Sequence, residues 1–382
     1  MSATDPRQAL FDLLESGIGE VYPGCVALVW RNGATLYHEA HGAVASHRWI
    51  PDEGKPVVRE QIYDLASLTK VLCTTSLAAL AVSEGAMELD MPVPEPWNAG
   101  CPGAALADVL EHCAGYEAHR EYFNEVEPYS ADGILEKICA TPPAYPLRSK
   151  AVYSDLGFMV LGRWLEQVYG RDLEVLFTDK VMLALGLDDK PIPHLSFHCL
   201  HGNPPPPRPH RERIAPTEIY DADLHPDGVL SHFDVRKNAE IARGFVHDDN
   251  AYVWGGVAGH AGLFGTAQGV LEVAIGWLDL LLPGLKPAVR DRFWRPSTVP
   301  GSTRRLGWDG PSPDGTGTAG RAVSPAAIGH TGYTGTSLWI DPRAAGGPTI
   351  AVLLSNRVHP VRTNEGIKAF RPRFHEAAFA VR

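Results

Sequence analysis

The two ends of the chain are rich in strand-forming residues, whereas the middle carries helical patterns, and this order restricts the possible folds. Near the N-terminus, the apolar runs 25–31 and 34–41 are joined by Asn32 and Gly33, a pair typical of a two-residue hairpin. Strand patterns return near the C-terminus. Helical periodicity is found throughout the middle and in three further segments nearer the ends. The predicted strands there are 326–330, 336–341 and 349–355, and the predicted helices are 5–17, 105–113, 131–139, 155–169, 173–185, 267–282 and 364–380.

This order predicts an α+β fold with three layers of the α/β/α kind. One antiparallel sheet would be built from both chain ends and flanked by helices, with an all-helical insert packed beside it. We expect 1–66 and 245–382 to form the α/β sheet domain and 67–244 a mainly helical domain. Within the latter, 190–235 holds four consecutive prolines and little apolar periodicity, which predicts an irregular loop. The active site is expected in the cleft between the domains.

Ser67 and Lys70 are separated by one helical turn at the start of a run that is apolar or small on all sides. Such a run, closed by Gly85, is typical of a helix buried in a large domain. Residues three apart share a helix face, so the Lys70 amine can lie against the Ser67 hydroxyl. Burial at the positive end of the helix would lower the pKa of Lys70 from its free value of about 10.4. The alternative is that Ser67 caps the helix and Lys70 reaches solvent.

Composition excludes several classes of function. The 382 residues are 45% apolar and 21% charged, as in a folded protein, and the net charge of −11 argues against a nucleic-acid partner. No signal sequence and no membrane-spanning segment is recognisable, so we expect a cytoplasmic protein without a membrane partner. The six cysteines lack the spacing of a zinc site or a disulfide framework. The sequence gives no indication of the oligomeric state.

Three further motifs carry polar groups suited to a catalytic cleft. Tyr153 and Asp155 stand at the start of a predicted helix, and the run from His330 to Gly332 precedes a predicted strand, where small residues let a substrate lie along the edge. The range 255–264 is dense in glycine and includes His260. Taken singly, each has a simpler reading as a helix cap, a solvated histidine or a turn.

Their joint order resembles the serine β-lactamase and penicillin-binding-protein superfamily, in its class C-like branch of esterases, D-aminopeptidases and acyltransferases. The resemblance extends over nearly the whole chain. It also includes the segments 22–24, 63–66, 111–116, 246–251 and 355–360. It implies the β-lactamase/transpeptidase-like fold and an acyl-enzyme mechanism without metal or cofactor. Ser67 would be the nucleophile, and Lys70 and Tyr153 would transfer its proton.

The resemblance further implies that the backbone N–H groups of Ser67 and Tyr333 bind the oxyanion, and that Asp155, His260, His330 and Gly332 contact the substrate. The chain departs from the class C pattern at two positions, because Asp155 replaces an asparagine and His330 replaces a lysine. A histidine is largely neutral at pH 7, and an aspartate adds negative charge. Both changes disfavour anionic substrates and favour small neutral esters or amides, although Asp155 could instead pair with Lys70.

Several alternatives remain open from the sequence. A β-lactamase, a D-amino acid peptidase or amidase, an acyltransferase and a non-catalytic scaffold or sensor would all fit the same fold. An α/β-hydrolase is disfavoured because no Gly-x-Ser-x-Gly motif is present. A metal site drawn from His194, His198, Cys199 and His201 would need a helix, which nearby Pro191, Pro193 and the proline run oppose.

Overall fold

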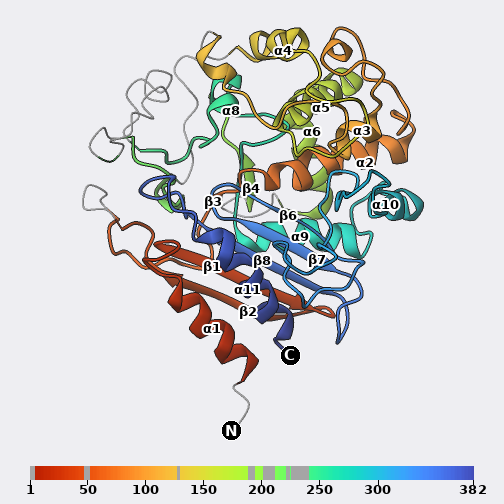
Figure 1. Ribbon diagram of the computed structural model, residues 1–382. Coiled ribbons are helices and arrows are strands. Elements are labelled where there is room, and N and C mark those ends of the chain that lie inside the picture. Colours follow the sequence, from red (N-terminus) through yellow and green to blue (C-terminus); the bar gives the residue numbers. More distant parts are fainter. Residues whose placement is uncertain are drawn as a thin grey trace.

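The computed structural model describes residues 5–46, 52–126, 130–187, 194–200, 211–220, 224 and 241–382. Its main sheet has five antiparallel strands in the order β2-β1-β8-β7-β6, so strands from both chain ends lie side by side (Figure 1). These strands are β1 (Gly24–Arg31), β2 (Ala34–Gly42), β6 (Ile328–Thr331), β7 (Ser337–Asp341) and β8 (Thr349–Ser355). The prediction of one antiparallel sheet built from the two ends is confirmed.

The predicted hairpin joins β1 to β2. Asn32 and Gly33 both have positive φ, 49° and 85°, which is the backbone of a type I′ turn. Side chains of β1 alternate between the two faces of the sheet, and all eight residues are buried. Val26 and Leu28 join the larger core, whereas Ala27 and Val29 join the smaller one. The sheet is therefore covered on both faces.

Helices cover the two faces and produce the three layers. Helices α1 (Pro6–Ser16) and α11 (Ile367–Ala380) pack on one face, with leucines of α1 and phenylalanines of α11 in the smaller core. Helix α9 (Ala267–Leu278) packs on the other face, against β1 and β8. Within the described part of the chain, no helix combines the length and the apolar character needed to cross a bilayer.

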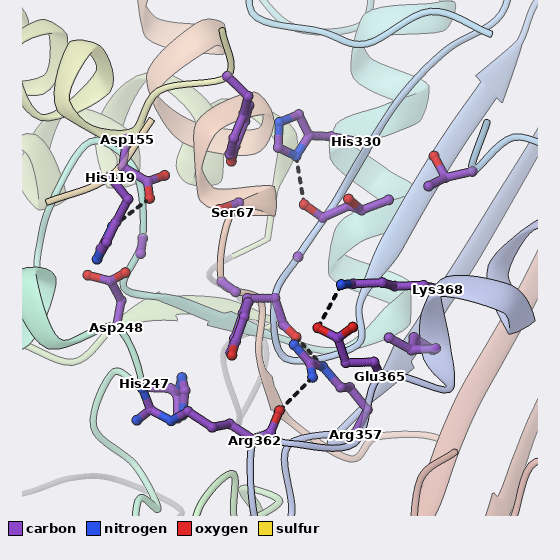
Figure 2. Close-up of a pocket in the computed structure, with 18 of the residues that line it drawn as sticks. Ser67, His119, Asp155, His247, Asp248, His330, Arg357, Arg362, Glu365 and Lys368 are labelled. Carbon is purple, nitrogen blue, oxygen red and sulfur yellow. Dashed lines mark hydrogen bonds and ion pairs between the residues drawn. The ribbon is translucent and has the colours of Figure 1, made fainter. Parts of the chain in front are cut away.

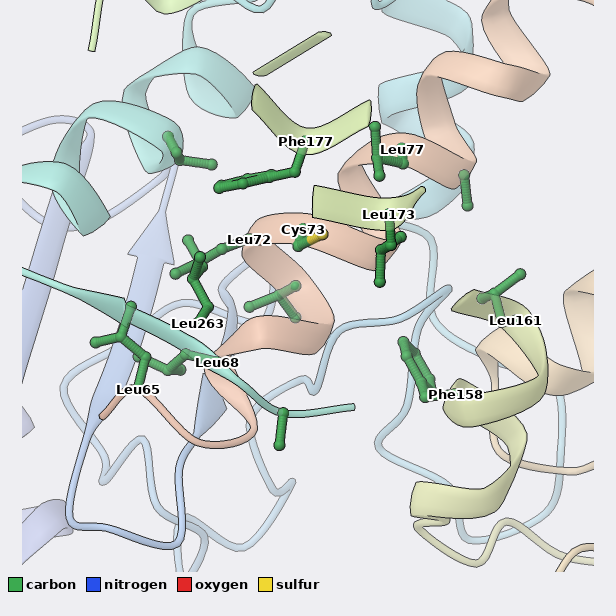
Figure 3. Close-up of a cluster of buried hydrophobic side chains, with 14 of the residues drawn as sticks. Leu65, Leu68, Leu72, Cys73, Leu77, Phe158, Leu161, Leu173, Phe177 and Leu263 are labelled. Carbon is green, nitrogen blue, oxygen red and sulfur yellow. The ribbon is translucent and has the colours of Figure 1, made fainter. Parts of the chain in front are cut away.

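The middle of the chain supplies a helical layer above the sheet (Figure 1). Its buried side chains form one cluster around the helix that follows Ser67, with Phe158 and Leu161 contributed by α5 (Figure 3). The helices are η1 (Lys70–Thr74, a π turn), α2 (Thr75–Glu84), η2 (Trp97–Gly100), α3 (Leu106–Leu110), η3 (Tyr122–Asn124), α4 (Ala131–Ala140), α5 (Asp155–Tyr169), α6 (Leu173–Phe177), η4 (Thr178–Met182), η5 (Leu183–Leu185) and η6 (Arg211–Arg213).

Some predicted boundaries were wrong. The helix expected over 105–113 is only five residues long, and the one expected over 173–185 changes from α to π to 3-10 geometry. The glycine-dense run leads into a short strand, β5 (Leu263–Gly265), which pairs with β3 (Tyr63–Asp64) and β4 (Leu195–Phe197). Strand β4 lies inside the range predicted to be an irregular loop, most of which falls outside the described residues. Helices α8 (Asp249–Trp254) and α10 (Pro287–Phe293) were not predicted.

Candidate active site

Ser67 lies in the short connection between β3 and the helix that begins at η1. The preceding residue, Ala66, has φ of 47°, a left-handed conformation that is uncommon for a residue with a side chain. The Asp64 carboxylate stabilises this turn by accepting a hydrogen bond from the Ala66 N–H at 2.8 Å. The turn places Ser67 on the wall of a cavity of about 680 Å³. Strain at this position is typical of functional sites.

Lys70 is fully buried and connects Ser67 to the helical layer. Its Nζ donates to Ser67 Oγ at 3.0 Å, to Asp155 Oδ1 at 2.7 Å and to the backbone oxygen of His260 at 3.2 Å. The predicted proximity of the amine to the Ser67 hydroxyl is therefore present. The alternative in which Lys70 reaches solvent is wrong because the side chain is 0% exposed.

The expected direction of the Lys70 pKa shift was wrong. Burial lowers the pKa of Lys70, but the Asp155 carboxylate and, less strongly, Tyr153 outweigh burial and leave the pKa above its ordinary value. The same ion pair holds the pKa of Asp155 well below its ordinary value, although burial alone would raise it. An opposite charge at 2.7 Å thus outweighs desolvation. Lys70 is an ammonium at neutral pH and donates to Ser67.

Tyr153 stands one residue before Ser154, the N-cap of α5, so its side chain leaves the helix end toward the cavity. The Tyr153 hydroxyl is buried and has no hydrogen-bond partner at standard geometry among the described residues. Lys70 Nζ lies 4.8 Å from the centre of its ring. Burial raises the pKa of Tyr153, and the charge of Lys70 opposes that rise without cancelling it. The phenol therefore lies beside Ser67 and Lys70, where it can donate or accept a proton.

His330, on β6, lines the cavity opposite Asp155 (Figure 2). Its Nδ1 lies 2.9 Å from the Thr331 backbone oxygen, and its buried Nε2 has no hydrogen-bond partner in the part of the chain that the structure describes. Burial lowers the pKa of His330 well below its ordinary value, with further contributions from the charges of Lys70 and Arg304. The imidazole is neutral at pH 7, so no cation stands at the position of the class C lysine.

Arg304 is a cavity residue that the sequence did not reveal. Its guanidinium lies 5.0 Å from the centre of the Tyr153 ring. Its ion-pair partner in the described part of the chain, Asp309, is 3.7 Å away, and the side chain is 21% exposed. No pattern marks Arg304, because it lies in an irregular segment between α10 and β6. It provides a cation near Tyr153 that could contact a ligand.

Gly332 lets the segment after β6 approach the turn 64–67 closely. A Cβ at this position would lie 2.5 Å from the Leu65 backbone oxygen and 2.1 Å from Thr336 Oγ1, so only glycine fits. The hydroxyls of Thr334 and Thr336 then donate to the backbone oxygens of Asp64 and Leu65, at 2.6 and 2.9 Å. These contacts hold the segment carrying Tyr333 beside the segment carrying Ser67.

The backbone N–H groups of Ser67 and Tyr333 take no part in the hydrogen bonds of a regular helix or strand. Neither group donates to any acceptor within the described residues, and both residues line the cavity. Free N–H groups from two adjoining segments can stabilise a negatively charged oxygen. The Tyr333 side chain itself is 51% exposed and lies between His247 and Arg357, with ring contacts to both.

His260, also expected at the site, lies behind the cavity wall. Its side chain is 1% exposed, and its Nε2 is 2.9 Å from Asp248 Oδ1, so the contact with Lys70 is through the backbone oxygen alone. Asp248 and His119 line the cavity beside Asp155 (Figure 2), and neither was predicted. The Asp155 and Asp248 carboxylates raise the pKa of His119 to about 8.

One group of side chains in the described ranges could hold a metal ion. The ligand atoms of His119, Asp155 and Asp248 lie within 4.8 Å of one another. Asp155 is already bound to Lys70, so a metal ion there would be close to an ammonium. The alternative metal site has no such geometry in its described part, since His194 and His198 flank strand β4 and His198 stacks on Phe264. His201 lies outside the described residues.

Comparisons with known proteins identify the family of this chain. The beta-lactamase family pattern matches residues 11–371. A protein of Escherichia coli (strain K12) named "Putative D-alanyl-D-alanine carboxypeptidase" is 32% identical over 364 residues, which cover 88% of this chain and 79% of that protein.

Solved structures that share the fold include a hydrolase and a synthase. EstCE1, described as a hydrolase with promiscuous acyltransferase activity, superposes with a TM-score of 0.70 at 19% identity and covers 98% of both chains. Simvastatin synthase from Aspergillus terreus gives a TM-score of 0.70 at 18% identity, covering 99% of both chains. With the family pattern extending over nearly all of the sequence, this chain belongs to the beta-lactamase family of serine hydrolases.

Proposed function

We propose that the protein is a carboxylesterase-like serine hydrolase that acts on small neutral esters or amides through an acyl-enzyme. The observation that carries the proposal is the 3.0 Å contact of Lys70 Nζ with Ser67 Oγ at the wall of an open cavity. A scaffold has no use for a buried cation beside an accessible hydroxyl, because burying charge is costly.

The proposed reaction has two halves. The reaction starts from the form of the protein in which the Lys70–Tyr153 pair has released one proton to solvent. Ser67 Oγ attacks the carbonyl carbon and passes its proton to this pair, and the carbonyl electron pair moves onto oxygen beside the Ser67 and Tyr333 N–H groups. The bond to the leaving group then breaks, and that group departs with the electron pair and takes the proton from the pair. Water then attacks the acyl carbon of the acyl-enzyme and gives its proton to the same pair. The bond to Ser67 Oγ breaks, and Oγ takes that proton back, which restores Ser67. Another alcohol or amine in place of water would give acyl transfer.

The preference for neutral substrates rests on the charges around Ser67. His330 is a neutral imidazole, and Asp155 and Asp248 contribute carboxylates on the opposite side (Figure 2). Losing one charge-assisted hydrogen bond to a substrate carboxylate costs about 1.5–3 kcal/mol, or about 10- to 150-fold in selectivity.

A second candidate is a D-amino acid carboxypeptidase. Arg304 favours it, because its guanidinium beside Tyr153 could bind the terminal carboxylate of a peptide substrate. The name of the Escherichia coli relative points to the same reaction class. In this case Arg304 would supply the cation that His330 does not.

Labelling with a fluorophosphonate probe, read by intact-mass spectrometry, tests the nucleophile. We expect one adduct on the wild type and none on Ser67→Ala. Tyr153→Phe should fold normally. It should lower kcat by about 10²–10⁴, because the Tyr153 hydroxyl can no longer take part in proton transfer with Lys70. Equal labelling of Ser67→Ala would contradict the assignment of the nucleophile. A loss below about threefold for Tyr153→Phe would give that residue a packing role.

A substrate panel separates the two candidate functions. The esterase proposal expects kcat/KM for p-nitrophenyl acetate or butyrate to exceed that for nitrocefin and for a peptide ending in two D-alanines, with His330→Lys improving nitrocefin relative to the ester. The carboxypeptidase proposal expects the peptide to be preferred, with Arg304→Ala raising its KM and leaving ester hydrolysis nearly unchanged. A preference of the wild type for nitrocefin would contradict both.

A further inference from the structure

Arg371 is a buried arginine without a carboxylate partner. It lies on α11, is 7% exposed, and forms no ion pair with any residue in the described part of the chain. Its guanidinium donates instead to two backbone oxygens, those of Gly332 at 2.5 Å and Thr336 at 2.9 Å. A buried charge is costly unless it is paired, so this arrangement requires an explanation.

The Gly332 oxygen belongs to the same peptide group as the Tyr333 N–H. In a trans peptide these two groups point in opposite directions, so a cation on the oxygen side leaves the N–H facing away from it. A hydrogen bond to the carbonyl polarises the peptide and strengthens its N–H as a donor. Arg357 fixes the next peptide, because its Nε donates to the Tyr333 oxygen at 2.7 Å.

Resting on the proposed function, we propose that Arg371 is a positioning residue for oxyanion stabilisation. It orients the Gly332–Tyr333 peptide and polarises its N–H toward the negative oxygen that forms after Ser67 attacks. The gain is specific to the transition state, because a neutral substrate carbonyl responds less to a polarised donor than an oxyanion does.

A purely structural role is the competing explanation, and the chain contains a matched case. Arg305 is also buried, at 3% exposed, and also donates to backbone oxygens, those of Trp294, Pro325 and Ala327. Burial and Arg357 lower the pKa of Arg371 to about 9, and burial also lowers that of Arg305. Arg371 differs because it lines the cavity, as Gly332 and Tyr333 do, and Arg305 does not.

The experiment compares Arg371→Met with Arg305→Met in ester hydrolysis, thermal unfolding and affinity for a boronic acid, which forms a tetrahedral anionic adduct with an active-site serine. We expect Arg371→Met to lower kcat by about 10- to 100-fold, less than the 10²–10³ for losing a whole oxyanion donor, with KM changed by less than about threefold. Boronic acid affinity should fall by the same factor as kcat/KM. Arg305→Met should lower the melting temperature and leave kcat and boronic acid affinity unchanged.

Arg371→Lys and Arg371→Ala keep the proposal testable if Arg371→Met does not fold. Arg371→Lys retains the charge but lacks the planar guanidinium, so its kcat should lie between those of the wild type and Arg371→Met. Added guanidinium should restore part of the rate of Arg371→Ala. The proposal is overturned if a folded Arg371 variant keeps kcat within about threefold, or if its boronic acid affinity stays at the wild-type value while stability falls. Failure of the proposed function is a different result, since the wild type would then neither hydrolyse esters nor bind the probe.

Discussion

At the scale of single residues, the ion pair between Lys70 and Asp155 determines when Ser67 can lose its proton. The pair keeps Lys70 protonated at neutral pH, and Tyr153 has a raised pKa as well. A group accepts a proton only in its unprotonated form, and that form becomes more populated as the pH rises toward the pKa. We therefore expect kcat/KM to increase with pH from neutrality into the alkaline range.

Asp155→Asn tests this argument. Without the carboxylate, burial dominates and the pKa of Lys70 falls, because an opposite charge this close shifts a pKa by about 1–3 units. The rising limb of kcat/KM should therefore move to lower pH by at least about one unit. The measurement is a pH profile of ester hydrolysis with wild type and variant. Asp155→Glu, which keeps the charge, serves as control, and an unmoved limb in Asp155→Asn would show that the pair does not govern activation.

The sequence predicted the proximity of residues spaced along one element, and it missed cavity residues placed by contacts between distant segments. Lys70 was predictable because it shares a helix face with Ser67, and the tertiary contact with Asp155 then reversed the expected direction of its pKa shift. Arg304 and Arg371 were not predictable. Their roles depend on which peptide or ring lies beside each guanidinium, and no local periodicity encodes that.

At the scale of elements, long and regular segments were predicted well. Helix α5 begins at Asp155 and ends at Tyr169 as expected, because Ser154 caps its start and Gly170 adopts a left-handed conformation at its end. The small sheet was missed, since β3, β4 and β5 have only two or three residues each and show no detectable alternation. Tertiary pairing alone defines such strands.

The contact between Gly332, just after β6, and the turn that carries Ser67 predicts a large effect of a single methyl group. Gly332→Ala should destabilise the fold by about 1–3 kcal/mol, because the Leu65 backbone oxygen cannot move away from the new Cβ without displacing Ser67. Activity should fall by more than about tenfold as the Tyr333 and Ser67 N–H groups separate. Urea denaturation and ester hydrolysis measure the two effects.

Gly276→Ala is the control for this prediction. It makes the same chemical change inside helix α9, where the nearest atoms to the new Cβ belong to the flexible Leu185 side chain at 3.3 and 3.4 Å. Since alanine favours helices over glycine by about 1 kcal/mol, we expect a small change in stability and full activity. Similar losses in both variants would contradict a specific role for the Gly332 contact.

Across the whole molecule, several histidines are buried, and one of them is completely enclosed. His375, on α11, is 0% exposed, and its Nε2 lies 3.0 Å from Ser337 Oγ on β7. Burial, with the charge of Arg371, lowers the pKa of His375 to about 3. An unfolded chain protonates the same histidine at about pH 6.5. Between these two values the unfolded state binds a proton that the folded state does not, so the free energy of unfolding falls as the pH decreases.

His375→Gln removes this proton uptake and keeps an amide that can bond to Ser337. From pH 7 to pH 5, the free energy of unfolding of the wild type should fall by about 2 kcal/mol more than that of the variant, as expected for a histidine pKa of about 3 folded and 6.5 unfolded. Urea denaturation at both pH values measures the difference. Ser337→Ala breaks the same hydrogen bond without removing the titrating group, so it should lower stability about equally at both pH values. If His375→Gln lost stability between pH 7 and pH 5 as steeply as the wild type, the acid sensitivity would have to come from other groups.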